Sequence, residues 1–227
     1  MINKYKQYRF QLLLPFVIIL LGSVFFFTYP KGEVVLLLNK LHNPTFNFIF
    51  RKLSSIGNAL SVFFFLLIVV RFKFKYLYFF ILAFAIESFI IIICKHLIFD
   101  GTFRPYLFFK ELGLLDAIDF VQGVKIRKTD SFPSGHTAYS FFIATFFVLK
   151  LNNLKSSVVI FLLATLIGVS RMYLVQHFFA DVFTGAVVGV LATYTAFILV
   201  FKTQKSWYNY RLTINTNKES LVVLTNE

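Results

Sequence analysis

The chain has 227 residues, of which 58% are hydrophobic, 20% are aromatic and only 15% are charged, and its net charge is +13. This composition is too apolar for an ordinary soluble domain, and repeated apolar runs have the length that a helix needs to cross a bilayer. We therefore expect an all-α integral membrane protein. Because the basic residues flank apolar runs, they favour contact with anionic lipid headgroups over binding of nucleic acid.

Cysteine usage excludes one large class of fold. The single cysteine, Cys94, rules out an intrachain disulfide framework, and no Cys/His cluster has the spacing of a zinc site. We expect neither a metal nor a cofactor. The apolar run 12–29 is longer than the core of a secretory signal and is followed by no small-residue cleavage site, so we interpret it as an uncleaved first membrane helix.

Six apolar segments predict a six-transmembrane-helix bundle. Between the first two segments, residues 34–41 and 46–50 are expected to form short interfacial helices. The longest connection, 99–132, joins the third and fourth spans and is expected to be a loop at headgroup level, of a length that is commonly functional. The expected spans are 11–29, 54–71, 76–98, 134–150, 155–174 and 179–201.

Basic residues suggest the orientation. An even number of spans places both termini on one side, and the short connections on that side, 71–75 and 150–155, are densely basic. The positive-inside rule gives such short segments the most weight, so we expect cytoplasmic termini and an outward-facing long loop. Residues 1–201 are expected to form the membrane domain. Residues 202–227 are expected to form a cytoplasmic tail that is either disordered or folded as a small hairpin of 212–214 with 221–223.

The segment 170–181, SRMYLVQHFFAD, places Arg171, His177 and Asp181 in an otherwise apolar stretch. Because residues four apart share a helical face, we expect Asp181 to reach the imidazole of His177 and to fix which ring nitrogen is free to react. A buried histidine that an aspartate satisfies, without any chemistry, explains this segment alone equally well.

The segment 131–140, SFPSGHTAYS, stands directly before the fourth span. Ser134, Gly135 and His136 fall at an expected helix N-terminus, with Pro133 in the first turn. Free backbone N–H groups and the helix dipole favour an anion there, while Gly135 allows close approach and Ser134 adds a hydroxyl donor. An ordinary helix start with an incidental histidine would give the same pattern.

Lys95 and Arg104 stand near the outer end of the third span, where either one alone would be interpreted as a snorkelling interfacial cation. Their position favours a shared site over isolated interfacial cations. At the same ends of the expected spans lie these two residues, Arg171 and the segments 134–136 and 177–181. Three cations, a helix N-terminus and two histidines predict a pocket for a dianionic phosphate.

Together these motifs resemble the type 2 phosphatidic acid phosphatase (PAP2) superfamily of membrane lipid phosphatases, which also includes soluble vanadium haloperoxidases. The family pattern is a Lys followed by Arg-Pro, then Pro-Ser-Gly-His, then Ser-Arg-x5-His-x3-Asp. The second and third blocks match in full at 133–136 and 170–181. The first block departs, because eight residues separate Lys95 from Arg104, two more than the family usually has.

The resemblance implies a metal-independent hydrolysis in two steps. His177, oriented by Asp181, would attack phosphorus and form a phosphohistidine, while His136 would protonate the leaving oxygen and then activate water. The phosphoryl oxygens would be held by cationic and hydrogen-bonding groups. These groups are Lys95, Arg104, Ser134, Gly135 and Arg171.

The resemblance also implies a class of substrate and a location. The implied substrates are undecaprenyl diphosphate, phosphatidylglycerol phosphate, phosphatidic acid and lipid A phosphates, at a bacterial inner membrane with the site facing the periplasm or the exterior. A lipid phosphotransferase, in which a hydroxyl acceptor replaces water, and a non-catalytic lipid-binding or transport protein stay open as alternatives. Membrane spans that flank every motif argue against a haloperoxidase. The sequence leaves the oligomeric state open.

Two features outside the motifs give packing predictions. Glu87 lies in the middle of the third span, where we expect it to pair with a polar residue of a neighbouring helix such as Asn58 or Ser61 in a structural role, with a substrate contact as the minority alternative. Gly185 and Gly189 form a GxxxG, which predicts close helix packing within the bundle, with a dimer interface as the minority alternative.

Overall fold

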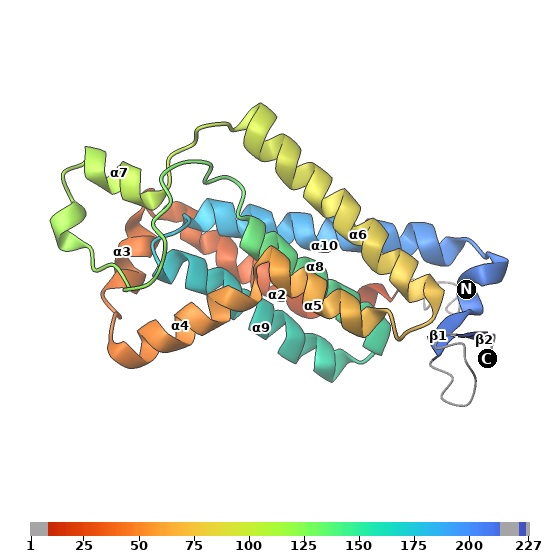
Figure 1. The fold of residues 1–227 in the computed structure, drawn as a ribbon. Helices are drawn as coiled ribbons and strands as arrows, with labels where there is room; N and C mark the ends of the chain where they lie inside the picture. The colour runs from red at the N-terminus through yellow and green to blue at the C-terminus, as the bar shows by residue number, and fades with distance from the viewer. Residues whose placement is uncertain (1–8, 214–222, 226–227) are drawn as a thin grey trace.

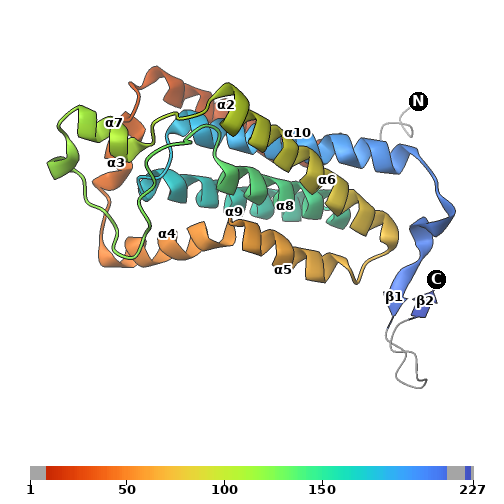
Figure 2. The same ribbon diagram turned by 45° about the horizontal axis from the view of Figure 1, so that its top comes forward.

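The computed structural model describes residues 9–213 and 223–225, and most of this part of the chain is helical. The long helices lie side by side along one axis (Figures 1 and 2). Two short helices, α3 (Glu33–Asn39) and α7 (Pro105–Glu111), lie at one end of this bundle. A two-stranded ladder of β1 (Arg211–Thr213) and β2 (Val223–Thr225) lies at the other end.

Four helical stretches are long and apolar enough to cross a membrane, and a bent helix pair would make a fifth. Five of the six expected spans each correspond to one helical stretch, and the span 54–71 falls on a bent helix pair. Because α8 (Gly135–Leu151) has only 17 residues, the count of six complete spans stays a prediction. The four stretches are η1 (Phe10–Leu13) with α2 (Leu14–Ser23) and η2 (Val24–Thr28), α6 (Phe74–Ile93) with the π-helical turn η3 (Cys94–Ile98), α9 (Leu154–Tyr173), and α10 (Phe179–Lys202).

The bent pair differs from the expectation of a short interfacial helix at 46–50 followed by a separate span at 54–71. Here α4 (Pro44–Ile56) and α5 (Ala59–Val69) meet at an angle of 59°. The side-chain oxygen of Asn58 caps α5 by accepting a hydrogen bond from the Ser61 N–H at 2.9 Å. A Cβ at Gly57 would lie 2.8 Å from side chains of both α8 and α9, so glycine allows the bend to pack tightly onto them.

The GxxxG of α10 packs against α8. A Cβ at Gly185 would lie 2.5 Å from the Ser134 carbonyl oxygen, and one at Gly189 would clash with the Ala138 carbonyl. The prediction that this motif packs helices within the bundle is therefore confirmed. The close approach also places the start of α8 beside the start of α10, where the Ser134 N–H donates a hydrogen bond to the Asp181 carbonyl at 2.9 Å.

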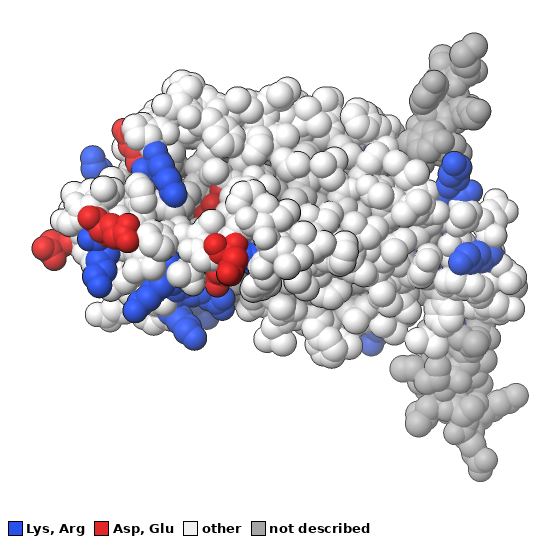
Figure 3. All heavy atoms as spheres, turned by 90° about the horizontal axis from the view of Figure 1, so that it is seen from above, with Lys and Arg blue, Asp and Glu red and all other residues white. Residues whose placement is uncertain are grey.

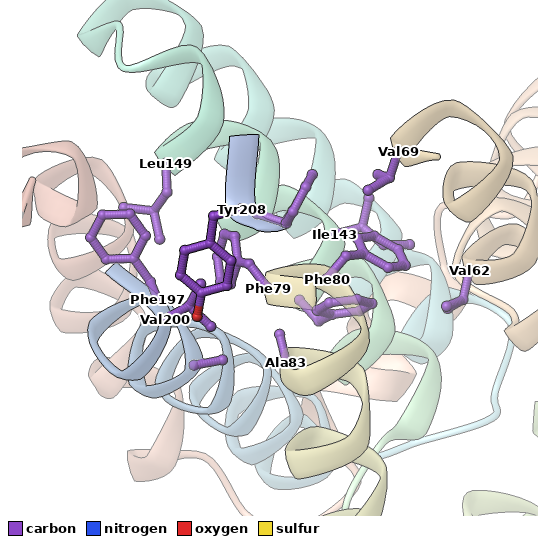
Figure 4. Close-up of a cluster of buried hydrophobic side chains, with 13 residues drawn as sticks. Val62, Val69, Phe79, Phe80, Ala83, Ile143, Leu149, Phe197, Val200 and Tyr208 are labelled. Atoms are coloured by element: carbon purple, nitrogen blue, oxygen red, sulfur yellow. The ribbon is translucent and has the colours of Figure 1, made fainter. Parts of the chain in front are cut away.

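A cluster of buried aromatic and aliphatic side chains joins α5, α6, α8 and α10 (Figure 4). The rings of Phe79 and Phe80 on α6 each lie 5.0 Å from the ring of Phe146 on α8. Phe197 of α10 lies 5.7 Å from Phe79. These residues occupy the halves of their helices far from the motif segments, so apolar packing holds the bundle together away from the polar end.

Charged side chains are unevenly distributed over the surface. On the face shown in Figure 3 they gather at the end that carries α3 and α7, a broad uncharged surface follows, and a few basic side chains appear at the opposite end. An uncharged belt between two polar ends is the surface that a bilayer-spanning protein needs.

Two regions outside the long helices contain regular secondary structure. The 99–132 connection contains α7 and η4 (Leu115–Ala117). In the tail, β1 and β2 pair antiparallel with Arg211 opposite Thr225, as expected for a small hairpin. Residues 214–222, which include part of the expected strands, lie outside the described residues.

The expected pairing of Glu87 with Asn58 or Ser61 is wrong. Glu87 is fully buried, one of its carboxyl oxygens accepts a hydrogen bond from Ser88 at 3.2 Å, and the other has no partner within the described chain. Asn58 instead bonds to the Ser61 backbone and hydroxyl, because it caps α5.

Candidate active site

A cavity of about 620 Å³ lies at the end of the bundle that carries the motif segments, between α5, α6, α8 and α9. Six of the eight predicted site residues line it, and the other two, Ser134 and Asp181, lie behind its wall. The basic, glycine and motif histidine residues in the wall are Lys95, Arg104, Arg127, Gly135, His136, Arg171 and His177. The predicted convergence of distant segments on one pocket is therefore seen in the structure.

His177 does not lie on a helix, so the expectation of a helical face shared with Asp181 is wrong. It stands in the turn between α9 and α10, where Val175 adopts a positive φ of 57°. The contact forms nevertheless, because Asp181 in the first turn of α10 reaches back: its Oδ2 lies 3.3 Å from Nδ1 of His177. The same oxygen accepts a hydrogen bond from the Phe178 N–H at 2.9 Å, so this carboxylate also caps α10.

Arg104 determines the tautomer of His177. Its Nη1 lies 3.0 Å from Nε2 of His177, and because a guanidinium has only donors, Nε2 must accept and carry no proton. The proton of the neutral ring is then on Nδ1, which donates to Asp181. Burial, followed by the charges of Arg104, Arg171 and Lys95, holds the pKa of His177 well below its usual value. A neutral ring with its Nε2 lone pair toward the cations is the form that a nucleophile needs.

Arg104 itself is fixed by backbone carbonyls. Its guanidinium donates to Thr129 at 2.7 Å, to Gln176 at 2.9 Å and to Asp130 at 3.1 Å, and the residue is only 4% exposed. Burial, followed by the charge of Arg127, lowers the pKa of Arg104 to about 10, which still leaves it charged at neutral pH. Arg104 is therefore a rigid cation beside the histidine.

The longer spacing still brings Lys95 to the cavity. The chain after Cys94 forms the π-helical turn η3, which takes up more residues per turn than an α-helix, and a short loop then leads to Arg104. Nζ of Lys95 donates to the Asp130 carbonyl at 2.6 Å, the same oxygen that accepts from Arg104. The shared acceptor holds the two cations next to each other.

Arg171 has a buried N–H donor without a hydrogen-bond partner in the described part of the chain. It lies in the last turn of α9, and its Nη1 donates to the Ser54 hydroxyl. Its buried Nε has no partner among the described residues. An unsatisfied guanidinium donor is costly in the free protein and strongly favours an anionic ligand.

The start of α8 places a backbone amide in the cavity wall, while the Ser134 hydroxyl lies behind it. Ser134 is fully buried outside the cavity wall and acts as the helix cap, because its hydroxyl oxygen accepts a hydrogen bond from the Thr137 N–H at 3.4 Å. The Thr137 hydroxyl donates to the same oxygen at 2.9 Å. A Cβ at Gly135 would meet only Ile91, at 3.9 Å, so the amide can be approached closely. Pro133 precedes the helix instead of lying in its first turn.

His136 is the second residue of α8 and lines the same cavity as His177. Its backbone carbonyl accepts a hydrogen bond from Ser140 at 2.8 Å. Its ring makes no hydrogen bond to any residue that the structure describes, which leaves both ring nitrogens available to a ligand.

Arg127 is a cavity residue that sequence reasoning missed. It is exposed in the cavity wall and makes no hydrogen bond or ion pair with the described residues. The backbone on either side is anchored, because Gln176 donates to the Lys125 carbonyl at 3.3 Å and Arg104 donates to the Thr129 carbonyl. In the sequence Arg127 is one of several basic residues of the 99–132 connection, and no motif distinguishes it from its neighbours.

We expect Arg127→Gln to raise KM for a lipid phosphate about threefold to tenfold and to leave kcat nearly unchanged, because one charge-assisted contact contributes on the order of 1 kcal/mol to binding. Steady-state kinetics in detergent measures both constants. Lys128→Gln is the matched control, since Lys128 is exposed beside it but is not part of the cavity wall. Equal effects of the two substitutions would contradict a specific role for Arg127.

In the described part of the chain, no three His, Cys, Asp or Glu side chains come together in a way that could hold a metal ion.

Comparison with known proteins identifies the family. The model of the PAP2 superfamily matches residues 72–205, which is more than half of the chain and includes every motif segment. The chain belongs to the PAP2 superfamily. The suspected resemblance is thus confirmed, and with its apolar helices this PAP2 protein is an integral membrane protein.

Individual relatives support the same assignment. The crystal structure of Aquifex aeolicus LpxE shares 29% identity, covers 76% of this PAP2 protein and 95% of that chain, and has a TM-score of 0.62. A lipid A 1-phosphatase of Porphyromonas gingivalis is 38% identical over 89 residues, which are 37% of this chain and only 20% of that longer relative. The PAP2-type phosphatidylglycerolphosphate phosphatase of Bacillus subtilis, with 20% identity, covers 89% of this chain and 99% of its own at a TM-score of 0.52, and supports the fold alone.

Proposed function

We propose that this PAP2 protein is a membrane lipid phosphatase that removes a phosphate from a lipid headgroup by way of a phosphohistidine. The observation that carries the proposal is the convergence of two histidines and four basic side chains on one cavity. A protein that only binds lipid has no need for an imidazole whose tautomer is fixed from both sides. The lipid phosphatase among the relatives favours the same reaction class.

In the first step, the phosphoryl group enters the cavity and takes over the Arg104 hydrogen bond that Nε2 of His177 accepts in the free protein. The freed lone pair attacks phosphorus, so that the N–P bond forms while the P–O bond to the lipid breaks. His136 gives its proton to the leaving oxygen. Asp181 accepts the Nδ1 hydrogen bond and stabilises the positive charge that develops on the ring.

In the second step, His136, now neutral, takes a proton from water while the water oxygen attacks phosphorus. The N–P bond breaks, its electron pair returns to Nε2, and inorganic phosphate is released. Lys95, Arg104 and Arg171 neutralise the charge on the phosphoryl oxygens in both steps. The amide of Gly135 and the start of α8 add an uncharged electropositive contact.

The cavity wall also explains why the substrate would be a lipid. Besides its polar residues, the wall contains apolar residues of α5 and α6, namely Ala59, Leu60, Ile91 and Ile92. A headgroup phosphate in the cavity would therefore place its alkyl chains against membrane helices. We propose that the site faces outward and that residues 202–227 are cytoplasmic, because the basic connections 71–75 and 150–155 lie at the opposite ends of the helices.

Phosphate release from a panel of lipid phosphates tests the proposal. The panel contains undecaprenyl diphosphate, phosphatidylglycerol phosphate, phosphatidic acid and a lipid A phosphate, each measured in detergent with and without EDTA. We expect release from at least one substrate and no loss in EDTA. Release from none would contradict the proposal, and activity lost in EDTA and restored by a divalent ion would point to a metal enzyme. Labelled phosphate found on an added alcohol acceptor would indicate a phosphotransferase.

A further inference from the structure

We propose that Ser131 is a positioning residue for this reaction, which holds the Asp181 carboxylate in the orientation that His177 requires. The inference rests on the proposed phosphatase function. Ser131 opens the segment 131–140, in which the sequence analysis assigned roles only to later residues.

The contact is direct and buried. The Ser131 hydroxyl donates a hydrogen bond to Oδ2 of Asp181, and Ser131 is only 2% exposed. The backbone of Ser131 is fixed as well, because its N–H donates to the Thr102 carbonyl at 3.2 Å. The Ser131 hydroxyl therefore reaches Asp181 from a backbone position that is fixed within the 99–132 connection.

Three polar contacts of the Asp181 side chain meet on one of its carboxylate oxygens. Oδ2 of Asp181 accepts from the Ser131 hydroxyl, accepts from the Phe178 N–H at 2.9 Å and lies 3.3 Å from Nδ1 of His177. A carboxylate turns easily about its last bond, so two fixed donors on one oxygen determine where that oxygen lies. Partners behind a catalytic or ligating histidine commonly fix its tautomer and ring orientation.

A second cavity lies next to the Asp181 carboxylate. This cavity, of about 420 Å³, is lined by Asp181, Ser131 and Lys31 and lies between the start of α10 and the turn before α3. The Lys31 ammonium lies above the Phe178 ring, 4.7 Å from its centre. Without the Ser131 hydrogen bond, only the Phe178 N–H would hold this oxygen, and the open space of this cavity would let the Asp181 carboxylate turn away from His177.

Ser131→Ala is therefore expected to lower kcat about tenfold to hundredfold, the usual effect of removing such a supporting hydrogen bond. KM should change less than about twofold, because Ser131 does not line the phosphate cavity. Ser131→Cys, which keeps the size but donates a much weaker hydrogen bond, should also lower kcat, while Ser131→Thr, which keeps the hydroxyl, should restore most of it.

Ser157→Ala is the matched control. Ser157 is likewise fully buried and donates to a backbone carbonyl, that of Leu12, but it lies in the first turn of α9, far from the cavity. The melting temperature of each variant in detergent shows whether it is folded. If the effect is purely structural, Ser131→Ala and Ser157→Ala should lower stability alike and leave kcat alike.

A double-mutant cycle with Asp181→Asn tests whether Ser131 acts through Asp181. We expect Ser131→Ala to cost less than about threefold in kcat once Asp181 is replaced, because the two losses are then not independent. Wild-type kcat in folded Ser131→Ala and Ser131→Cys, or an undiminished cost in the Asp181→Asn background, would overturn the inference. Failure of the unmodified protein to release phosphate from the whole panel would instead remove the proposed function itself.

Discussion

Replacing His177 by alanine should abolish phosphate release, with a loss in kcat on the order of 10⁴-fold or more. The proposed reaction passes through a bond between Nε2 of His177 and phosphorus. Among the described residues, His177 is the imidazole that contacts Asp181 through one ring nitrogen and Arg104 through the other. The measurement is phosphate release in detergent from the best substrate of the panel.

His96→Ala is the control for this experiment. His96 also borders the cavity but has no part in the proposed mechanism, so its replacement should leave most of the activity. Both variants must keep the elution volume and the melting temperature of the unmodified protein. Turnover retained in a folded His177→Ala variant would eliminate His177 as the nucleophile.

Replacing His136 by glutamine should lower kcat for a lipid phosphate about 10²-fold to 10⁴-fold, the usual contribution of general acid–base catalysis. A lipid alkoxide is a poor leaving group and needs a proton, whereas the phenolate of p-nitrophenyl phosphate leaves without one. We therefore expect the first step to stay fast with the aryl phosphate. The second step still needs His136 to activate water, so a burst of about one nitrophenol per enzyme should precede slow turnover.

Rapid-mixing absorbance measurements reveal this burst. Equal losses for both substrates, with no burst, would show that His136 contributes to binding or structure and does not transfer the proton. Ser140→Ala provides a comparison, because within the described residues the Ser140 side chain makes its hydrogen bond to the backbone carbonyl of His136 and none to the imidazole.

Motif spacing predicted the cavity well because every motif lies where a helix begins or ends. Lys95 is in the turn that ends the third span, His136 begins α8 and Arg171 is in the last turn of α9. Helices that run side by side bring such ends together, whatever the details of their packing. For the same reason Lys95 and Arg104 both line the cavity despite the longer spacing between them, because a π-helical turn and a loop accommodate the two additional residues.

Local geometry at these ends was less predictable. Periodicity placed His177 and Asp181 on one helical face, but His177 lies in a turn and Asp181 reaches back as a helix cap. The Ser134 hydroxyl, which was predicted to bind phosphate, accepts the hydrogen bond that caps α8. Both arrangements have one cause: side chains near a helix end first satisfy the free backbone N–H groups there, and apolar periodicity carries no information about that requirement.

The supporting residues were the least accessible to sequence reasoning. Arg127 and Ser131 lie in the 99–132 connection, whose path is set by backbone contacts from distant residues, such as the Arg104 N–H donating to the Lys128 carbonyl at 2.9 Å. Tertiary contacts of this kind leave no periodic signal in the sequence. Glu87 shows the same limitation, because the partner expected for it is occupied in capping another helix.

The proposed reaction depends on a covalent bond between phosphorus and His177. The most direct measurement mixes the protein with a substrate labelled with ³²P, quenches within one turnover and locates the label after proteolysis. We expect an acid-labile, alkali-stable phosphoramidate on the peptide that contains His177, absent from His177→Ala and long-lived in His136→Gln. Rapid turnover without any protein-bound label, or a label on another residue, would contradict it.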